Sequence, residues 1–287
     1  MDLHLQQATS PCILRVCKPY RMNQIRLSFL SMLLMSSVLV SAQTFNLSTE
    51  LLNGSFNSGG PIGFIDVDND GLDDVVVFDQ GEDVNILYQT ATGFNPVHYG
   101  EVSSSNQWGA CIGDIDNDGI KDIFAGGSYD GVHLMRIGTG GNFEMDNLDN
   151  GQMFMQACNM ADLDNDGVLD AFGCHDDALS RMWKGETGGL PLNDQTLMPL
   201  TGYDFSDYPD TDHSGNYGTV FSDFDSDGDV DLFIAKCRQF VSDPNDPRRI
   251  NQLWVNDGQG GWTEEALERG LVFYEQSWTA DFGDIDN

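Results

Sequence analysis

Short apolar runs of strand length recur along residues 58–287, and Gly, Asn and Asp residues separate them. One run in each unit follows an acidic segment, at residues 75–78, 123–125, 171–172 and 232–234. A second apolar pair follows later, at Leu87-Tyr88, Leu134-Met135, Met182-Trp183 and Leu253-Trp254. No useful stretch has helical periodicity, so the pattern predicts an all-β fold with about four strands per unit of about 50 residues.

The acidic segments are copies of one nonapeptide, Asp-x-Asp-x-Asp-Gly-x-x-Asp. Complete copies span residues 66–74, 114–122, 162–170 and 223–231, and a fifth starts at Asp284 and Asp286. Their first aspartates are 48, 48, 61 and 61 residues apart, a spacing typical of repeated small sheets. We therefore expect residues 58–287 to hold four complete units and the start of a fifth, after a leading segment at residues 43–57.

The nonapeptide has the chemistry of a calcium loop. Calcium takes six to eight oxygen ligands in flexible geometry, whereas magnesium demands an octahedron and zinc favours the His and Cys residues that these loops lack. Loop positions 1, 3, 5 and 9 offer carboxylates, position 7 offers a backbone carbonyl, and the glycine at position 6 permits a reversal with φ > 0. The predicted ligands are Asp66, Asp68, Asp70, Leu72 and Asp74; Asp114, Asp116, Asp118, Ile120 and Asp122; Asp162, Asp164, Asp166, Val168 and Asp170; Asp223, Asp225, Asp227, Asp229 and Asp231; and Asp284 and Asp286.

An EF-hand begins with a similar pattern, but it needs a bidentate acid at position 12 and a helix on each side. Position 12 is Val77, Ala125, Gly173 or Ile234 here, and the flanking residues favour strands. The EF-hand and dockerin interpretations both fail at that position.

The loops and their spacing resemble the FG-GAP/VCBS repeats of integrin α-subunit propellers and of many bacterial surface proteins. The segment 217–271, with SDFDSDGDVDL at 222–232 and NQLWVNDG at 251–258, is similar to the ASPIC/UnbV, or cartilage-acidic-protein-like, group. The resemblance covers residues 58–287. It implies a β-propeller of about seven blades, of which this chain would hold a carboxyl-terminally truncated part, with calcium in the hairpin between the first two strands of each blade.

The amino-terminal residues have the pattern of an export signal. Residues 22–42 contain a short basic region, an apolar stretch from 27 to 40 and the small-residue site Val40-Ser41-Ala42. An uncleaved anchor is the alternative, although the apolar stretch is short for a membrane span. Residues 1–21 do not resemble a signal, and we interpret them as an over-extended start. The signal predicts a secreted or cell-surface protein whose mature chain does not insert into a membrane.

The charge of the chain restricts its partners. It has 46 acidic and 13 basic residues, a formal net charge of −33. Nucleic acid and anionic membrane surfaces would repel such a chain. A disordered acidic chain is the other interpretation, but 40% of the residues are hydrophobic and the acids recur in register.

Four cysteines follow the signal, and none is in a CxxC pair. Cys158 lies four residues before the third loop and Cys174 four residues after it. If the flanking strands form a hairpin, the two residues would face each other, so we expect a disulfide between them, with a buried reduced pair as the alternative. Cys111 and Cys237 are expected to be free buried thiols.

Aromatic residues recur in the repeat and are expected to pack between units. Trp108, Tyr217 and Trp278 each stand six residues before a first aspartate, and we assign Tyr88, Trp183 and Trp254 to a second shared position. Ligand contacts are instead expected in loops that depart from the repeat, at residues 204–214 and 239–249.

The sequence therefore favours a calcium-binding module for adhesion or ligand binding, whose partner is an extracellular glycan or protein. No GxSxG or HExxH motif is present, and we expect no enzymatic activity. A calcium-dependent polysaccharide-processing propeller of the lyase type and a passive spacer are the two alternatives. A buried Lys or Arg beside a calcium loop would support the enzyme.

Overall fold

The computed structural model describes residues 47–149, 151–189, 213–273 and 275–283. The chain divides into two units, Met1–Leu47 and Ser48–Asn287, and every strand named below belongs to the second. The signal, the over-extended start, residues 43–46 of the leading segment, the fifth loop and residues 204–212 lie outside the described residues. None of the described helices is long and apolar enough to cross a membrane.

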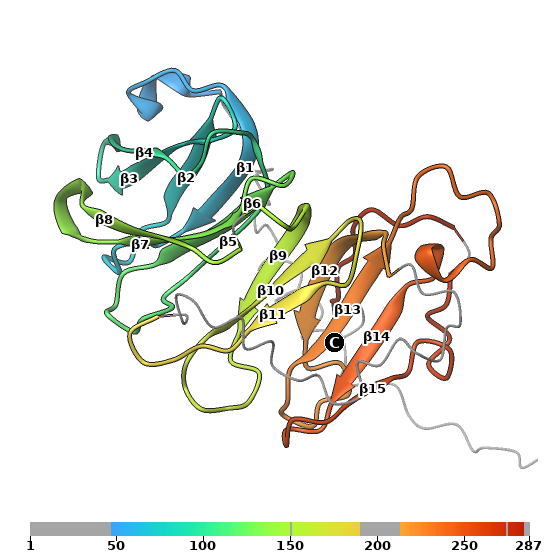
Figure 1. Cartoon of the computed structure of the whole chain (residues 1–287). Coiled ribbons are helices and arrows are strands. Elements are labelled where there is room, and N and C mark those ends of the chain that lie inside the picture. The colour runs from blue at the N-terminus through green and yellow to red at the C-terminus, as the bar shows by residue number, and fades with distance from the viewer. Residues whose placement is uncertain (1–46, 150, 190–212, 274, 284–287) are drawn as a thin grey trace, which may run out of the picture. The chain divides into compact units, whose positions relative to one another are not determined.

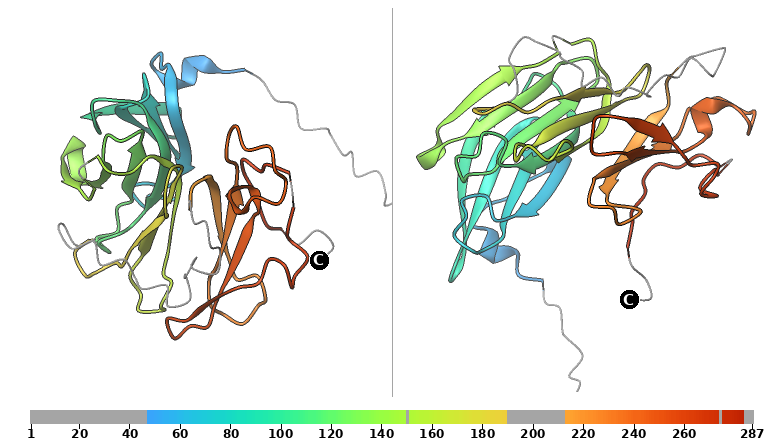
Figure 2. Two further views of the ribbon diagram at one scale, coloured as in Figure 1. Left: turned by 45° about the vertical axis from the view of Figure 1, so that its right-hand side comes forward. Right: turned by 90° about the horizontal axis from the view of Figure 1, so that it is seen from below.

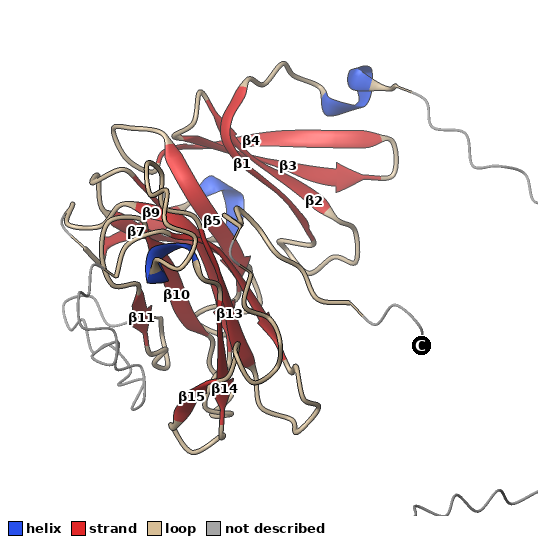
Figure 3. Ribbon diagram, turned by 90° about the vertical axis from the view of Figure 1, so that its right-hand side faces the viewer, coloured by secondary structure: helices blue, strands red, loops and turns tan. Residues whose placement is uncertain are grey.

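The described residues form strands arranged in four antiparallel sheets, which confirms the all-β prediction (Figure 1). Within each sheet, strands that are consecutive in the sequence lie side by side. The sheets are β1(Ser58–Ile65), β2(Asp74–Asp79), β3(Asp83–Thr90) and β4(Gly93–Glu101); β5(Gln107–Gly113), β6(Asp122–Gly127), β7(Val132–Ile137) and β8(Phe143–Asn147); β9(Met155–Ala161), β10(Asp170–His175) and β11(Arg181–Trp183); and β12(Asn216–Ser222), β13(Asp231–Lys236), β14(Gln252–Asn256) and β15(Trp262–Glu264). Helical turns are short, at η1(Thr49–Leu52), η2(Thr139–Gly141) and η4(Pro247–Arg249), as Figure 3 shows.

Each acidic loop connects the first and second strands of its sheet. The second strands β2, β6, β10 and β13 begin at the ninth residue of the loop. They are buried along almost their whole length, because each lies between two strands and under a neighbouring sheet. The apolar runs that follow the loops are therefore the central strands of the four sheets.

Successive sheets pack on one another through their faces and their first strands (Figures 1 and 2). Three apolar clusters fill the spaces between them, around Phe78 for the first and second sheets, around Phe124 for the second and third, and around Phe172 for the third and fourth. The first strands β1, β5, β9 and β12 contact each other in that order. At Gly109 an added Cβ would lie 2.9 Å from the Cα of Ala157, so these backbones approach closely.

The predicted packing of aromatic residues is confirmed for some positions only. Trp183 and Trp254 are buried, but Trp108 and Trp278 remain 53% and 65% exposed. Their rings still contact other aromatic rings, since Trp108 lies 5.2 Å from Phe154 and Trp278 lies 5.6 Å from Tyr217 between centroids.

The assignment of Tyr88 to the position of Trp183 and Trp254 is wrong. In the strand pairing, Trp183 is opposite Ala171 and Leu87 is opposite Val75, which are the residues that follow the ninth aspartates. Leu87 is therefore the equivalent of Trp183. Tyr88 comes one residue later and points to the other face of its sheet.

The predicted disulfide between Cys158 and Cys174 is also wrong, because both thiols are free. Cys158 pairs with Gly173, and Cys174 pairs with Ala157. The two cysteines are one step out of register, so their side chains lie on opposite faces of the sheet and enter different apolar clusters. Cys237 is a free buried thiol as expected, whereas Cys111 is free but only partly buried.

Candidate metal centres

The four acidic loops share most of their internal hydrogen bonds. In the first loop the carboxylate of Asp66 accepts from the backbone N–H of Asp70 at 3.0 Å and of Gly71 at 2.8 Å. The third and fourth loops repeat both contacts, and the second loop repeats the contact to its glycine. The carboxylate at position 5 accepts from the backbone N–H at position 7 in every loop. These contacts close the turn without using every carboxylate oxygen.

Two residues of each loop have left-handed backbone geometry. The predicted glycine at position 6 has φ between 85° and 99°. Position 4 also has positive φ, at 61° in Asn69, 58° in Asn117 and Asn165 and 62° in Ser226. Asn tolerates this region better than most residues, so its presence in three of the four loops was a signal that our sequence analysis missed.

The aspartate at position 9 has a structural role that the sequence analysis also missed. Asp122 is buried, and its two carboxylate oxygens accept from the backbone N–H groups of Ile115 at 3.0 Å and Ile137 at 2.9 Å. These contacts join the start of the loop to the end of the third strand, β7. The same pair of contacts occurs at Asp74, Asp170 and Asp231.

The structure brings three carboxylates of each described loop together, with one oxygen from each residue within 4.8 Å of the others. These sets are Asp66, Asp68 and Asp70; Asp114, Asp116 and Asp122; Asp162, Asp164 and Asp170; and Asp223, Asp225 and Asp231. They do not include Asp74, Asp118, Asp166 and Asp227, nor the position-7 residues Leu72, Ile120, Val168 and Asp229 whose carbonyls were predicted to contribute. Asp284 and Asp286 lie outside the described residues.

The donor set of these loops fits a hard cation. All the clustered groups are carboxylates, which calcium prefers. Within the described residues, Oδ1 of Asp114 and Oδ1 of Asp164 are buried and have no hydrogen-bond partner. A buried carboxylate oxygen without a partner is costly, and a cation held between the clustered oxygens would satisfy it.

Burial and neighbouring charges disfavour the ionised form of the aspartates at position 9 when no cation is bound. Burial raises the pKa of Asp122 to about 7, and the charges of Asp116 and Asp118 act in the same direction. Burial likewise raises the pKa of Asp170 to about 6 and the pKa of Asp231 above its ordinary value. A divalent cation would counter both causes, because it replaces lost hydration and neutralises the neighbouring charges.

Neighbouring loops are linked through their position-4 side chains. Nδ2 of Asn117 donates to the carbonyl of Gly167 at 3.2 Å, which joins the second loop to the third. Nδ2 of Asn165 donates to Oδ1 of Asp229 at 2.8 Å, which joins the third loop to the fourth. The loops therefore lie side by side along one end of the successive sheets.

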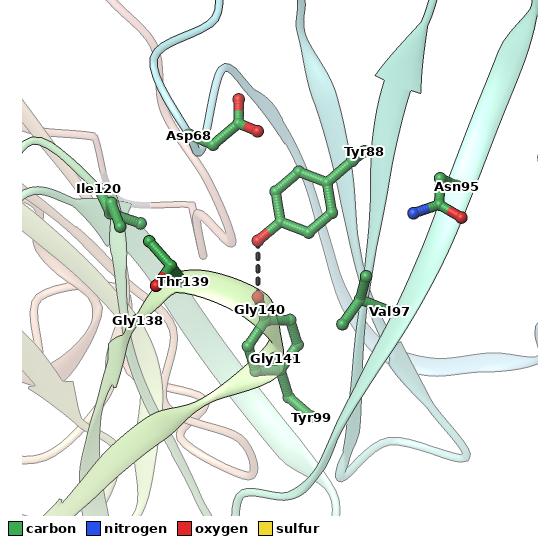
Figure 4. Close-up of a pocket in the computed structure, with 10 residues that line it drawn as sticks. All are labelled: Asp68, Tyr88, Asn95, Val97, Tyr99, Ile120, Gly138, Thr139, Gly140 and Gly141. Atoms are coloured by element: carbon green, nitrogen blue, oxygen red, sulfur yellow. Dashed lines mark hydrogen bonds between the residues drawn. The ribbon is translucent and has the colours of Figure 1, made fainter.

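A cavity of about 340 Å³ lies beside the first loop. Asp68 of that loop, the rings of Tyr88 and Tyr99 and the glycine-rich segment 138–141 line it (Figure 4). The two phenol oxygens are 2.7 Å apart, and burial raises the pKa of both hydroxyls. One hydroxyl donates to the other, so the pair keeps one O–H for a further acceptor.

The two lysines that bear on the enzyme alternative differ in position. Lys184 lies beside the third loop, but its side chain is 38% exposed. Lys236 is buried, but its Nζ donates to the carbonyl of Ser214 at 2.9 Å and to Asn216 at 2.8 Å at the far end of β13 from the loop. Neither lysine is a buried cation at a calcium loop. Arg136, whose side chain is 16% exposed, lines a pocket with Asp116 and Asp118 of the second loop, but its ion pairs are with Glu144 and Asp146.

These features define an all-β protein of repeated antiparallel sheets, each with an acidic loop between its first two strands. Residues 66–125 and 114–173 each match the model of the FG-GAP-like repeat family. These two matches overlap at residues 114–125 and together include the first three loops. The fourth loop lies outside the matched residues and has the same hydrogen bonds. No curated protein matches the chain.

Proposed function

We propose that this chain is part of an exported, calcium-stabilised β-propeller that serves as a binding or adhesion module and has no catalytic role. The observation that carries the proposal is the repetition of one carboxylate cluster in four successive sheets, two of them with a buried oxygen that has no partner among the described residues. FG-GAP repeats often bind calcium, and the match to that family supports the same cation.

The clustered aspartates would hold the cation in each loop, with the position-7 carbonyl as a further ligand. In this proposal calcium stabilises the hairpin between the first two strands. The ninth aspartate connects this hairpin to the third strand through its hydrogen bonds to two backbone N–H groups. The finer kinship, to integrin α-subunits or to the ASPIC/UnbV group, rests on the motifs at 222–232 and 251–258.

The propeller architecture is supported by the order of the sheets. Each sheet packs on the next through a first strand that contacts the first strand of its neighbour, as strands around a central axis do. Export is supported by the signal pattern at residues 22–42 and by the extracellular occurrence that is typical of FG-GAP repeats.

The binding role is supported by the cavity beside the first loop. It combines two aromatic rings with the carboxylate of Asp68, a combination suited to a glycan or to a polar peptide side chain. A calcium ion in the first loop would sit at the rim of this cavity, so that ligand binding there would depend on calcium.

Thermal unfolding in a calcium titration tests the cation. We expect the unfolding midpoint to be higher in millimolar calcium than in EGTA. Free calcium at ten times the Kd of a site adds about 1.4 kcal/mol per site to the free energy of unfolding. Magnesium at the same concentration should have a much smaller effect. An equal response to both cations, or to neither, would remove calcium from the proposal.

Binding to arrays of immobilised glycans and extracellular proteins tests the module. We expect retention that EGTA abolishes and that Tyr88→Ala weakens at least fivefold, since this change removes an aromatic face and a hydroxyl from the cavity. Leu267→Ala is the matched control, because Leu267 is 74% exposed and does not line the cavity. Retention that is unaffected by EGTA and by Tyr88→Ala would contradict a role for this site.

A further inference from the structure

In each sheet one residue in the third strand, or directly after it in the case of Lys184, lies beside the acidic loop of that sheet. The pairing of Val75 with Leu87 and of Ala171 with Trp183 fixes the repeat register. The residue after each buried partner lies on the opposite face of its strand. These residues are Tyr88, Arg136, Lys184 and Val255.

From this position the side chain of Lys184 reaches the carboxylates of the third loop. Its Nζ forms ion pairs with Oδ2 of Asp164 and, at 3.0 Å, with Oδ2 of Asp166. These carboxylates occupy loop positions 3 and 5, which the calcium assignment gives to the cation. The ammonium satisfies only one oxygen of Asp164, because Oδ1 of that residue stays buried without a partner in the described part of the chain.

The other loops have no comparable cation. Arg136 of the second sheet lines a pocket with Asp116 and Asp118, but it forms its ion pairs with Asp146 at 2.7 Å and Glu144 at 3.3 Å. Arg269 lies 3.8 Å from Asp225 of the fourth loop but pairs at 2.8 Å with Glu265. The first loop has no ion pair with a Lys or Arg among the described residues, and its equivalent position holds the neutral Tyr88.

We propose that Lys184 is a resident cation of the third loop, which a divalent ion must displace before it binds there. The inference rests on the proposed function, since it assumes that the loops bind calcium. The third loop is then the weakest of the four described calcium sites. It is also the one loop among them whose charge is already countered by an ammonium when calcium is scarce.

The properties of the two cations favour displacement of the Lys184 ammonium by calcium over permanent occupation of the third loop by the ammonium. An ammonium is one positive charge with three donors on a flexible stem, whereas calcium gathers six or more oxygens, including the one that Lys184 leaves unpaired. The side chain of Lys184 is 38% exposed, so it can move into solvent. Breaking two partly exposed ion pairs and leaving a positive charge nearby corresponds to a loss of about tenfold in calcium affinity.

Calcium titration of the full chain against a chromophoric chelator tests this inference in the wild type and in Lys184→Met. We expect one wild-type site to be about tenfold weaker than the others and Lys184→Met to remove that difference. Lys121→Met is the matched control. It removes the same charge from the second loop, where Lys121 forms no ion pair among the described residues, and it should tighten calcium binding there far less than Lys184→Met does in the third loop.

A second measurement separates this inference from a general charge effect. In EGTA, Lys184→Met should lower the unfolding midpoint, because the carboxylates of the third loop lose their counter-charge, and Lys121→Met should not. Calcium binding by the wild type with no tightening in Lys184→Met would overturn the inference and leave the proposed function intact. Failure of all three proteins to bind calcium would instead overturn the proposed function.

Discussion

Replacing Asp122 by alanine is expected to destabilise the protein by about 2–5 kcal/mol even in EGTA, because two buried backbone N–H groups lose their acceptor. These donors are the amides of Ile115 and Ile137, which the carboxylate holds at 3.0 and 2.9 Å. The loss is a large share of the 5–15 kcal/mol that separates typical folded domains from their unfolded chains. Urea unfolding of the purified variants measures it.

Two further variants show whether this effect comes from the backbone contacts or from the metal. Asp122→Asn keeps one acceptor oxygen, so it should lose less stability than Asp122→Ala. Asp118→Ala is the matched control from the same loop, because Asp118 is exposed and, among the described residues, its carboxylate accepts only from the amide of Ile120. It should change the stability in EGTA by less than about 1 kcal/mol.

The opposite result has a clear meaning. If Asp122 served only as a metal ligand, its replacement by alanine in EGTA would remove a buried carboxyl group that burial disfavours in its ionised form. The stability would then be unchanged or higher. An Asp122→Ala protein as stable as the wild type in EGTA would therefore contradict the structural role of the ninth aspartate.

The sequence could predict the loops because their information is local. Nine consecutive residues contain the carboxylates, and the glycine that allows the turn lies among them, so no long-range contact is needed to recognise them. The all-β prediction has the same origin, since the short apolar runs between turn residues exclude long helices. The hydrogen bonds at Asp122 could not be read in this way, because one donor, Ile137, belongs to the third strand.

The errors at the cysteines and at Tyr88 share one physical cause. A shift of one residue in the register of a strand moves each side chain to the other face of its sheet, and counting from the loop did not fix the register. Asp170 pairs with Ala161, so Cys158 meets Gly173 and misses Cys174. The sequence did contain the information needed to place Tyr88 correctly. A constant spacing of 21 residues from each first aspartate relates Leu87, Met135 and Trp183, whereas matching residue types placed Tyr88 with the tryptophans.

The same dependence on long-range contacts hid the role of Lys184. The sequence places it 20 residues after Asp164, and only the hairpin brings its ammonium to the loop. The small residues between successive sheets were hidden for the same reason. The sequence analysis singled out Trp108 and Tyr217, but the glycine that follows each of them, Gly109 or Gly218, lies close to the backbone of the next segment, at Ala157 or Trp278.

Replacing Gly109 by valine is expected to destabilise the protein by about 3 kcal/mol, because the new side chain meets backbone and cannot be accommodated by a rotamer change. An added Cβ would lie 2.9 Å from Cα, 3.1 Å from the carbonyl carbon and 3.2 Å from the nitrogen of Ala157 in β9. The first strands of the second and third sheets would have to separate, which also loosens the cluster around Phe124.

Gly283→Val is the matched control, because an added Cβ at Gly283 meets nothing within 4 Å. We expect it to unfold within about 0.5 kcal/mol of the wild type in urea, as exposed substitutions usually do. Because Gly109 lies away from the acidic loops, its variant should still gain stability from calcium by the same increment as the wild type. Equal stabilities of the two valine variants would mean that β5 and β9 are not in tight contact. The stacking of sheets through their first strands, on which the propeller proposal rests, would then have to be abandoned.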